Sequence, residues 1–353
     1  MFFLSWDWIG GWIETADIVP TILIGRHDGR TVLLATLMPA SRRGVTGLMV
    51  HTLHLNATGV QALDIITIEY NGFLVETGLE GRFEAEAIRF LTSGIIVAGH
   101  RRDELHIKTA SAPIDTAIVG SNVAFSEVQS KLSYRIDLNA VRATGKPYLD
   151  TLSANTRQQI RRSMRLYEKR GALVATRAAS VDQALDWLDK MGVLHQIYWT
   201  ARGEAGGFAY PFFIKFQQHM LRRCLATGTV ELFRITAGEQ AIGYVYNFVY
   251  RGHVYAYLTG TLYEDDAKLK PGLVNHTLCI DAHLAEGAAI YDFMAGDNRY
   301  KSNLGKPGPD MFYFVAQRPT LTQKLENRLR DLKHRFDAWL KPPAPPVQPA
   351  PET

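Results

Sequence analysis

The second half of the chain alternates apolar runs with amphipathic stretches in a regular order. Two β-type runs, residues 241–250 and 253–261, flank Arg251-Gly252, a pair suited to the tight turn of a hairpin. Around this hairpin the pattern predicts helices at 153–170, 180–197, 211–226 and 271–286, and strands at 172–177, 229–236, 289–294 and 311–317. This order predicts an α+β domain with a mixed, mostly antiparallel sheet.

The first half is richer in strands. Its pattern predicts a Trp-rich helix at 5–16, strands at 21–25 and 31–38 around Asp28-Gly29, a helix at 82–91 and a strand at 94–99. Residues 100–140 are too irregular for their strands to be placed. We expect a domain boundary at Gly145-Lys146-Pro147, which separates an N-terminal domain, 1–146, from a C-terminal domain, 147–318.

Beyond Thr320 the pattern is that of one amphipathic helix, expected at 319–341. Its apolar residues recur at intervals of three and four, and they are Leu321, Leu325, Leu329, Leu332, Phe336, Trp339 and Leu340. The other face is basic, with Lys324, Arg328, Arg330, Lys333, Arg335 and Lys341. Such a helix either lies on an anionic membrane surface or packs on the preceding domain. Residues 342–353 are proline-rich and are expected to be disordered.

Composition narrows the class of protein. The 353 residues are 46% hydrophobic and 21% charged, typical of a soluble globular protein. The start of the chain lacks the basic region of a secretory signal, and Cys224 and Cys279 have no metal-ligand spacing, so we expect a cytoplasmic protein with buried thiols and no metal.

The net charge of +4 is unevenly spread, and the basic stretches 157–170 and 324–341 suit anionic partners. Aromatic residues are not interleaved with the basic ones, which argues against DNA.

One motif is suited to binding an anionic donor. Lys270-Pro271-Gly272-Leu273 opens the helix expected at 271–286 and follows directly after the hairpin. The free N–H groups of a helix start attract phosphate, and proline at the first helical position costs no hydrogen bond. The sequence therefore predicts a site for a phosphorylated acyl donor here, and a simple turn is the alternative.

A second group follows the buried strand 289–294. Asp297, Tyr300 and Lys301 lie where an α/β fold places its ligands. Lys301 could stabilise an oxyanion or neutralise a substrate phosphate. Asp297 could orient the incoming ammonium or help remove its proton, and His276 on the donor helix is a candidate base. The alternatives are a structural ion pair between Asp297 and Lys301 and a packed His276.

Two further groups are candidates for substrate binding. Trp199 and Arg202 stand in a glycine-containing connection between two helices, 198–207, which could close over a ligand or could simply anchor the loop. Arg161 belongs to a basic row on the helix 153–170 that could contact an anion or face solvent.

Several stretches together resemble the GNAT superfamily of N-acyltransferases, in particular its CelD-like branch from cellulose biosynthesis. They are Asn155 to Arg162, Trp199 to Gly203, Lys270 to Gly272 and Asp292 to Lys301, with Phe3 to Trp8 and Ile68 to Gly72 in the N-terminal half. That branch is related to FemAB-type proteins, which carry two GNAT folds in one chain. The resemblance implies two tandem GNAT-like domains and an acyl-CoA or acyl-carrier thioester as co-substrate.

Three functions follow from the resemblance. The first is transfer of an acyl group to an amine, such as an amino sugar or a long-chain lipid amine, in envelope lipid or polysaccharide metabolism. An acyl carrier protein and peripheral contact with an anionic membrane on its inner face are the partners this function implies. The second is FemAB-like peptidyl transfer from aminoacyl-tRNA, and the third is a non-catalytic accessory role in polysaccharide biosynthesis.

Overall fold

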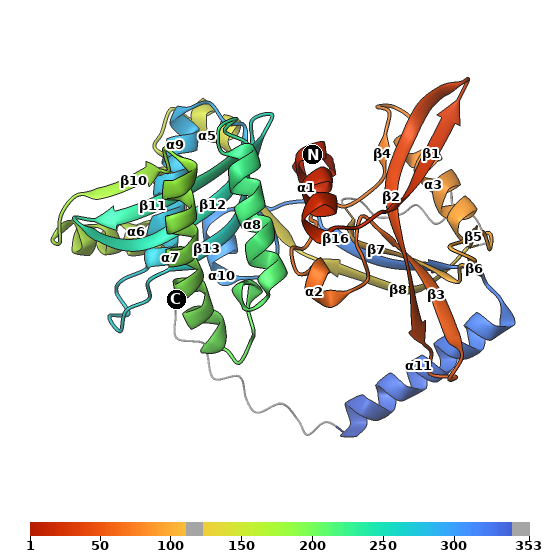
Figure 1. Ribbon diagram of the computed structural model, residues 1–353. Helices are drawn as coiled ribbons and strands as arrows, with labels where there is room; N and C mark the ends of the chain where they lie inside the picture. The colour runs from red at the N-terminus through yellow and green to blue at the C-terminus, as the bar shows by residue number, and fades with distance from the viewer. Residues whose placement is uncertain (111–122, 341–353) are drawn as a thin grey trace. The chain divides into compact units, whose positions relative to one another are not determined.

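A computed structural model describes residues 1–110 and 123–340 (Figure 1). Within these residues the chain forms two compact units, each built from two separate stretches. Unit 1 contains Met1–Thr15 and Leu132–Pro309, and unit 2 contains Ala16–Lys131 and the stretch that begins at Asp310. The expected consecutive domains, 1–146 and 147–318, differ from these units. The first 15 residues belong to unit 1, and the stretch that begins at Asp310 belongs to unit 2. The expected tail, 342–353, lies outside the described residues.

The sheet of unit 1 has the strand order β10-β11-β12-β13-β14-β9-β15. Its strands are β9 (Ser133–Asp137), β10 (Leu173–Arg177), β11 (Val230–Ala237), β12 (Gln240–Tyr250), β13 (His253–Thr261), β14 (Ile290–Ala295) and β15 (Lys306–Pro307). All neighbours are antiparallel except β13 and β14, which are parallel. The predicted hairpin is confirmed: β12 and β13 turn at Arg251 and Gly252, whose φ angles of 51° and 76° are those a tight hairpin turn requires.

The helices of unit 1 follow the predicted pattern closely. They are α1 (Trp6–Ala16), α5 (Leu138–Ala143), α6 (Ala154–Glu168), α7 (Val181–Thr200), α8 (Pro211–Cys224), α9 (Pro271–Ala285) and α10 (Arg299–Leu304), with short 3-10 turns at Phe2–Leu4, Tyr148–Thr151 and Gly207–Ala209. The hydroxyl of Ser153 accepts a hydrogen bond from the N–H of Thr156 and so caps α6. Ser180 caps α7 in the same way through the N–H of Gln183.

Aromatic packing explains why the first residues of the chain belong to unit 1. The ring of Phe2 stacks on Phe248 at 4.3 Å between ring centres, and Trp8 packs edge-on against Phe216 at 4.9 Å. Phe2 and Phe3 have no exposed surface. Burial of a phenylalanine side chain contributes roughly 2–3 kcal/mol, so this N-terminal segment is firmly held on the sheet.

Unit 2 contains a second sheet, with the order β1-β2-β3-β7-β16-β8 and with β4 beside β2. The strands are β1 (Thr21–His27), β2 (Arg30–Arg43), β3 (Met49–Leu55), β4 (Leu74–Val75), β7 (Glu104–Ala110), β8 (Ala124–Lys131) and β16 (Met311–Gln317). The unit also holds α2 (Gln61–Asp64), α3 (Glu80–Leu91), the small pair β5 (Ile96–Val97) and β6 (His100–Arg101), and α11 (Leu321–Leu340).

Two sequence predictions are corrected in unit 2. The strand expected at 311–317 forms, but it pairs with β7 and β8 and so completes the sheet of unit 2 rather than that of the C-terminal domain. In unit 1 the position beside β14 is taken by β9. The strand expected at 94–99 is reduced to Ile96–Val97, because the chain turns back at Ala98 and Gly99 with φ angles of 49° and 77°.

No helix of the described part of the chain combines the length and the apolar character needed to cross a membrane.

Candidate functional site

The two parallel strands of unit 1 pair only where they begin. His253, Val254 and Tyr255 of β13 pair with Ile290, Tyr291 and Asp292 of β14, and the rest of β13, residues 256–261, continues without pairing to β14. On its other side β13 carries a bulge at Tyr257, because Tyr246 pairs with Leu258 whereas Asn247 pairs with Ala256. A bulge at a strand edge redirects backbone groups and is frequent beside active sites.

The start of α9 presents backbone donors next to these diverging strands. The N–H of Lys270 donates to the buried hydroxyl of Ser163 at 2.9 Å, and Pro271 has no N–H. Of the four N–H groups that a helix start leaves without a helical partner, those of Gly272 and Leu273 remain. A Cβ at Gly272 would lie 3.6 Å from the hydroxyl of Tyr263, so the phenol of Tyr263 borders this helix start. The predicted donor motif therefore offers two amides and a phenol.

Three tyrosines from separate elements surround the same place. Tyr198 of α7 stacks on Tyr263, with 5.4 Å between ring centres. Burial of its hydroxyl raises the pKa of Tyr263 to about 12, although 42% of the residue surface is exposed. Burial, with the neighbouring hydroxyls of Tyr263 and Tyr198, also raises the pKa of Tyr300 well above 10. Both phenols are therefore protonated at neutral pH and can donate hydrogen bonds.

His276 is enclosed rather than open to a substrate. It is 2% exposed, its ring stacks on Tyr300 at 5.4 Å, and its Nδ1 lies 3.2 Å from the hydroxyl of Tyr291. Burial and the charge of Lys301 lower its pKa to about 3, so the imidazole is neutral at physiological pH. This geometry suits a residue that positions the Tyr300 ring better than it suits a general base.

Lys301 directs its ammonium at the end of β14. Its Nζ donates to the carbonyl oxygens of Phe293 at 2.7 Å and Ala295 at 2.6 Å, and the residue is 6% exposed. These carbonyls belong to a distorted strand end, where Met294 has a φ of 57° and Gly296 a φ of 126°. The ammonium therefore stabilises the backbone bend that leads to Tyr300.

Asp297 lies on the exposed side of the same bend. Its carboxylate accepts a hydrogen bond of 3.2 Å from the hydroxyl of Tyr134 on β9. Asp297 and Lys301 thus contact different groups, the first a phenol and the second backbone carbonyls. An exposed carboxylate held by one hydrogen bond remains able to accept a second from a substrate ammonium.

The three predicted substrate-binding residues lie in different surroundings. The guanidinium of Arg202 stacks on Tyr198 at 3.6 Å from the ring centre, which joins it to the tyrosine group. The indole of Trp199 donates to Nε2 of His195 at 2.9 Å, so it fixes the end of α7. Arg161 forms an ion pair with Asp150 at 2.7 Å, on α6.

Sequence reasoning missed Tyr198, Tyr263 and the bulge at Tyr257. Tyr198 directly precedes Trp199, and Tyr263 stands between the hairpin and the Lys-Pro-Gly motif, so both stood beside motifs already singled out. Their meeting depends on the way α7 crosses the sheet, which local patterns do not specify. The bulge has no residue signature, because it is defined only by the register of β12 and β13.

One cluster of potential metal ligands occurs among the described residues of unit 1. Glu231, His283 and Glu286 have ligand atoms within 4.8 Å of one another. Arg177 already supplies a cation there, with its Nε 3.1 Å from Glu231 and a terminal nitrogen 2.6 Å from Glu286. Burial raises the pKa of Glu231 to about 7 despite Arg177. Arg177 therefore already supplies a positive charge to this partly exposed cluster, and a metal ion would have to displace it.

Comparison with known proteins matches part of the chain to one domain family. Residues 154–302 match the acetyltransferase (GNAT) domain family. Among solved structures, FemX shares the fold with a TM-score of 0.58 at 11% identity, over 89% of this chain and 92% of FemX. The C-terminal domain of a candidate lysylphosphatidylglycerol synthetase from Agrobacterium fabrum follows, with a TM-score of 0.51 at 10% identity over 93% and 91% of the two chains. A conserved protein of unknown function from Bacteroides thetaiotaomicron has a TM-score of 0.50 at 10% identity, over 89% of this chain and 90% of that protein.

No curated protein matches the sequence. The matched domain supports an acyltransferase activity for this part of the chain. Residues 154–302 therefore match the GNAT domain family that the sequence motifs resemble, and the chain shares the overall fold of FemX.

Proposed function

We propose that unit 1 transfers an acyl group from a phosphate-bearing thioester, acyl-CoA or an acyl carrier, to an amine of an envelope lipid or polysaccharide. The observation that carries the proposal is the convergence of three kinds of donor at one place. The part of β13 beyond Tyr255, which does not pair with β14, offers backbone groups, the start of α9 offers the N–H groups of Gly272 and Leu273, and two protonated phenols offer hydroxyls. Acyl transfer needs such donors around a developing oxyanion and a charged donor tail.

The reaction follows from these positions. The donor phosphate binds at the start of α9, and its thioester carbonyl lies along β13 between residues 256 and 261. The substrate ammonium first loses a proton to water. The neutral amine then attacks the carbonyl carbon, a C–N bond forms, and the oxyanion accepts hydrogen bonds from the edge of β13. The intermediate then collapses with cleavage of the C–S bond, and the proton lost by nitrogen passes through water to the thiolate.

Each predicted catalytic residue receives a role in this scheme. Tyr300 and Tyr263 donate hydrogen bonds to the oxyanion or to the departing sulfur, because their raised pKa values keep them protonated. Asp297 orients the incoming ammonium from the exposed side. His276 and Lys301 are positioning residues: the first holds the ring of Tyr300 and the second holds the strand end.

A second candidate function has one specific observation in its favour. The similarity to FemX covers 92% of that chain and both units of this one, so the whole two-unit fold is shared and not only a single GNAT domain. Another neighbour is named for an aminoacylated lipid product. The alternative is therefore aminoacyl transfer from aminoacyl-tRNA, in which an ester C–O bond takes the place of the thioester C–S bond.

The two functions are separated by offering both donors. The purified chain would be incubated with labelled acyl-CoA or with labelled aminoacyl-tRNA, each with amino sugars, long-chain amines or a lipid extract, and the amide product identified by mass spectrometry. The proposal expects product from acyl-CoA or from acyl carrier thioester. Product from aminoacyl-tRNA alone would establish the second function, and absence of product with every donor would favour the accessory role.

The donor position is tested separately by binding. Gly272→Phe should weaken CoA binding, measured by calorimetry, whereas Gly272→Ala should not, because the φ of Gly272 is not positive and the nearest atom to a new Cβ is 3.6 Å away. If both variants bind CoA with equal affinity, the donor does not bind at the start of α9.

A further inference from the structure

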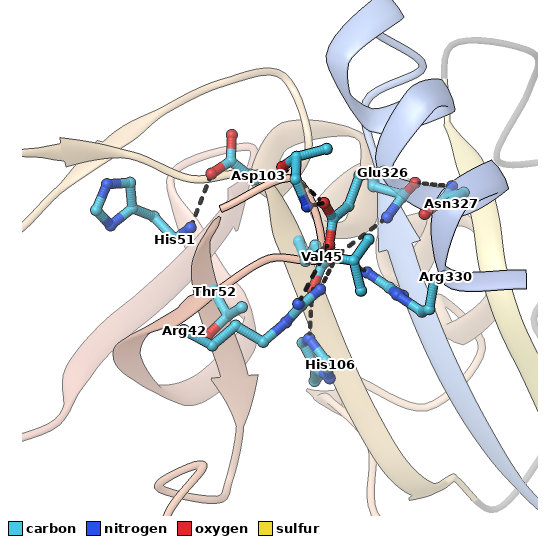
Figure 2. A network of polar contacts seen from close by, with 12 residues as sticks. Arg42, Val45, His51, Thr52, Asp103, His106, Glu326, Asn327 and Arg330 are labelled. Carbon is cyan, nitrogen blue, oxygen red and sulfur yellow. Dashed lines mark hydrogen bonds and ion pairs between the residues drawn. The ribbon is translucent and has the colours of Figure 1, made fainter. Parts of the chain in front are cut away.

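The last helix is attached to unit 2 by its polar face. Glu326 accepts hydrogen bonds from the N–H groups of Val45 and Thr46, at 2.9 and 3.1 Å, at the tip of the β2–β3 hairpin. One turn further on, Arg330 donates to Glu104 of β7 at 3.1 Å (Figure 2). Between them, Asn327 donates to Gln317 of β16 at 2.6 Å.

A buried carboxylate fixes this attachment. The side chain of Glu104 has no exposed surface and accepts hydrogen bonds from Arg42 at 2.9 Å, in addition to Arg330. His106 lies 3.0 Å from the same carboxylate (Figure 2). Removal of one partner from a buried charge group of this kind is strongly destabilising, so the helix has a fixed orientation on unit 2.

The apolar face of α11 consequently points to solvent. Leu321, Leu325, Leu329 and Leu332 are 84%, 53%, 37% and 60% exposed. With 3.6 residues per turn these four leucines fall within an arc of roughly 80°. Amphipathic helices normally bury this stripe against their own domain, and α11 does the reverse. An exposed row of leucines marks an interaction surface.

The charges beside the leucine stripe are mostly basic. Among the exposed residues from 321 to 336 there are four basic side chains, Lys324, Arg328, Lys333 and Arg335, and one acidic side chain, Asp331. At 3.6 residues per turn Lys324, Arg328 and Arg335 lie along one border of the stripe and Lys333 along the other. The hairpin tip that Glu326 holds beside the helix adds exposed apolar residues, Val45, Leu48 and Met49.

We propose that the exposed face of α11 is a docking surface for an anionic lipid bilayer. A stripe of leucines bordered by lysine and arginine matches the boundary between acyl chains and anionic headgroups, in which such helices lie parallel to the membrane plane. The ion pairs of Glu104 and Glu326 keep the stripe turned outward before any membrane is met, so no rearrangement is required. This inference does not depend on the reaction proposed for unit 1.

The test is co-sedimentation of the full chain with vesicles. Vesicles of phosphatidylcholine containing phosphatidylglycerol should bind the protein, and vesicles of phosphatidylcholine alone should bind it weakly. The double variant Leu325→Gln and Leu332→Gln should lower the partition coefficient about tenfold or more. The variant Lys324→Gln and Arg328→Gln should lower it by roughly 25-fold at low salt, and added salt should abolish that difference.

A matched control uses exposed apolar residues elsewhere in unit 2. Phe90 of α3 and Ile96 of β5 are 54% and 73% exposed, so Phe90→Gln with Ile96→Gln removes similar apolar surface. This control should bind vesicles like the parent. The proposal is overturned if the parent binds neither vesicle, if the control loses as much binding as the leucine variant, or if sedimentation velocity shows a dimer that the leucine variant dissociates.

Discussion

Lys301 offers the sharpest distinction between a chemical and a structural role. In Lys301→Met the apolar chain is retained while the ammonium is lost, so the carbonyls of Phe293 and Ala295 lose donors at 2.7 and 2.6 Å. A hydrogen bond to a charged group contributes about 1.5–3 kcal/mol, which gives roughly 3–6 kcal/mol for the pair. For a unit of this size each kcal/mol shifts the melting temperature by about 2–4 °C. We therefore expect unit 1 to melt roughly 6–24 °C lower.

The measurement is differential scanning calorimetry of the full chain, with Lys306→Met as control. Lys306 is five residues further on, in β15, and is exposed, so its replacement should leave the transition almost unchanged. Transfer activity would be expressed per folded molecule. If Lys301→Met melts like the parent and yet loses its transfer activity, the ammonium acts on the substrate and its placement as a strand anchor is wrong.

Three further predictions concern the remaining charged and polar residues. Burial alone would raise the pKa of Glu104, but His106 and Arg42 lower it to about 2, against 4.5 in the unfolded chain. The free energy of unfolding of unit 2 should therefore fall by about 3 kcal/mol as the pH falls from 5 to 2. Chemical denaturation of Glu104→Gln across this range should show a flatter dependence, and an unchanged slope would contradict the assignment. Asp297→Asn should melt like the parent because Asp297 is exposed, while the KM for the amine rises about two- to fivefold and kcat changes less. Gly272→Phe should raise the KM for the acyl donor about tenfold or more, with the acceptor KM as the internal reference.

Local patterns predicted the elements of the fold well. The turn at Arg251-Gly252 needs two residues that accept positive φ, and the hairpin it predicts is present with β12 and β13 in antiparallel register. The strand predicted at 289–294 is also present, as β14. In both cases residues close in sequence carry the information.

Pairing between distant segments was not predictable from the same patterns. The apolar strand 311–317 was visible in the sequence, but nothing in its residues specifies which of two sheets it joins, and it completes the sheet of unit 2. The N-terminal helix was likewise visible, whereas its packing on unit 1 depends on aromatic contacts such as Trp8 on Phe216. The amphipathic pattern of α11 was evident, but buried ion pairs determine that its polar face meets unit 2.

The candidate site shows the same division. The Pro-Gly helix start could be found from sequence because its donors follow from helix geometry. The direction of the Lys301 ammonium could not, because it depends on a φ of 57° at Met294 that turns strand carbonyls toward it. The sequence also did not predict that Tyr198, Tyr263 and Tyr300 lie together, because they come from separate elements that meet only in the folded unit.

The central claim is that amide formation takes place among these tyrosines at the ends of β13 and β14. It is tested most directly by the single-turnover rate of acyl transfer in the double variant Tyr263→Phe with Tyr300→Phe. Both changes keep the rings, so the stack on His276 and the fold should persist. We predict that the rate falls about 10²-fold or more while Tyr244→Phe, a buried tyrosine elsewhere in the sheet, transfers like the parent. A double variant that transfers at the parental rate would place the chemistry elsewhere in the molecule.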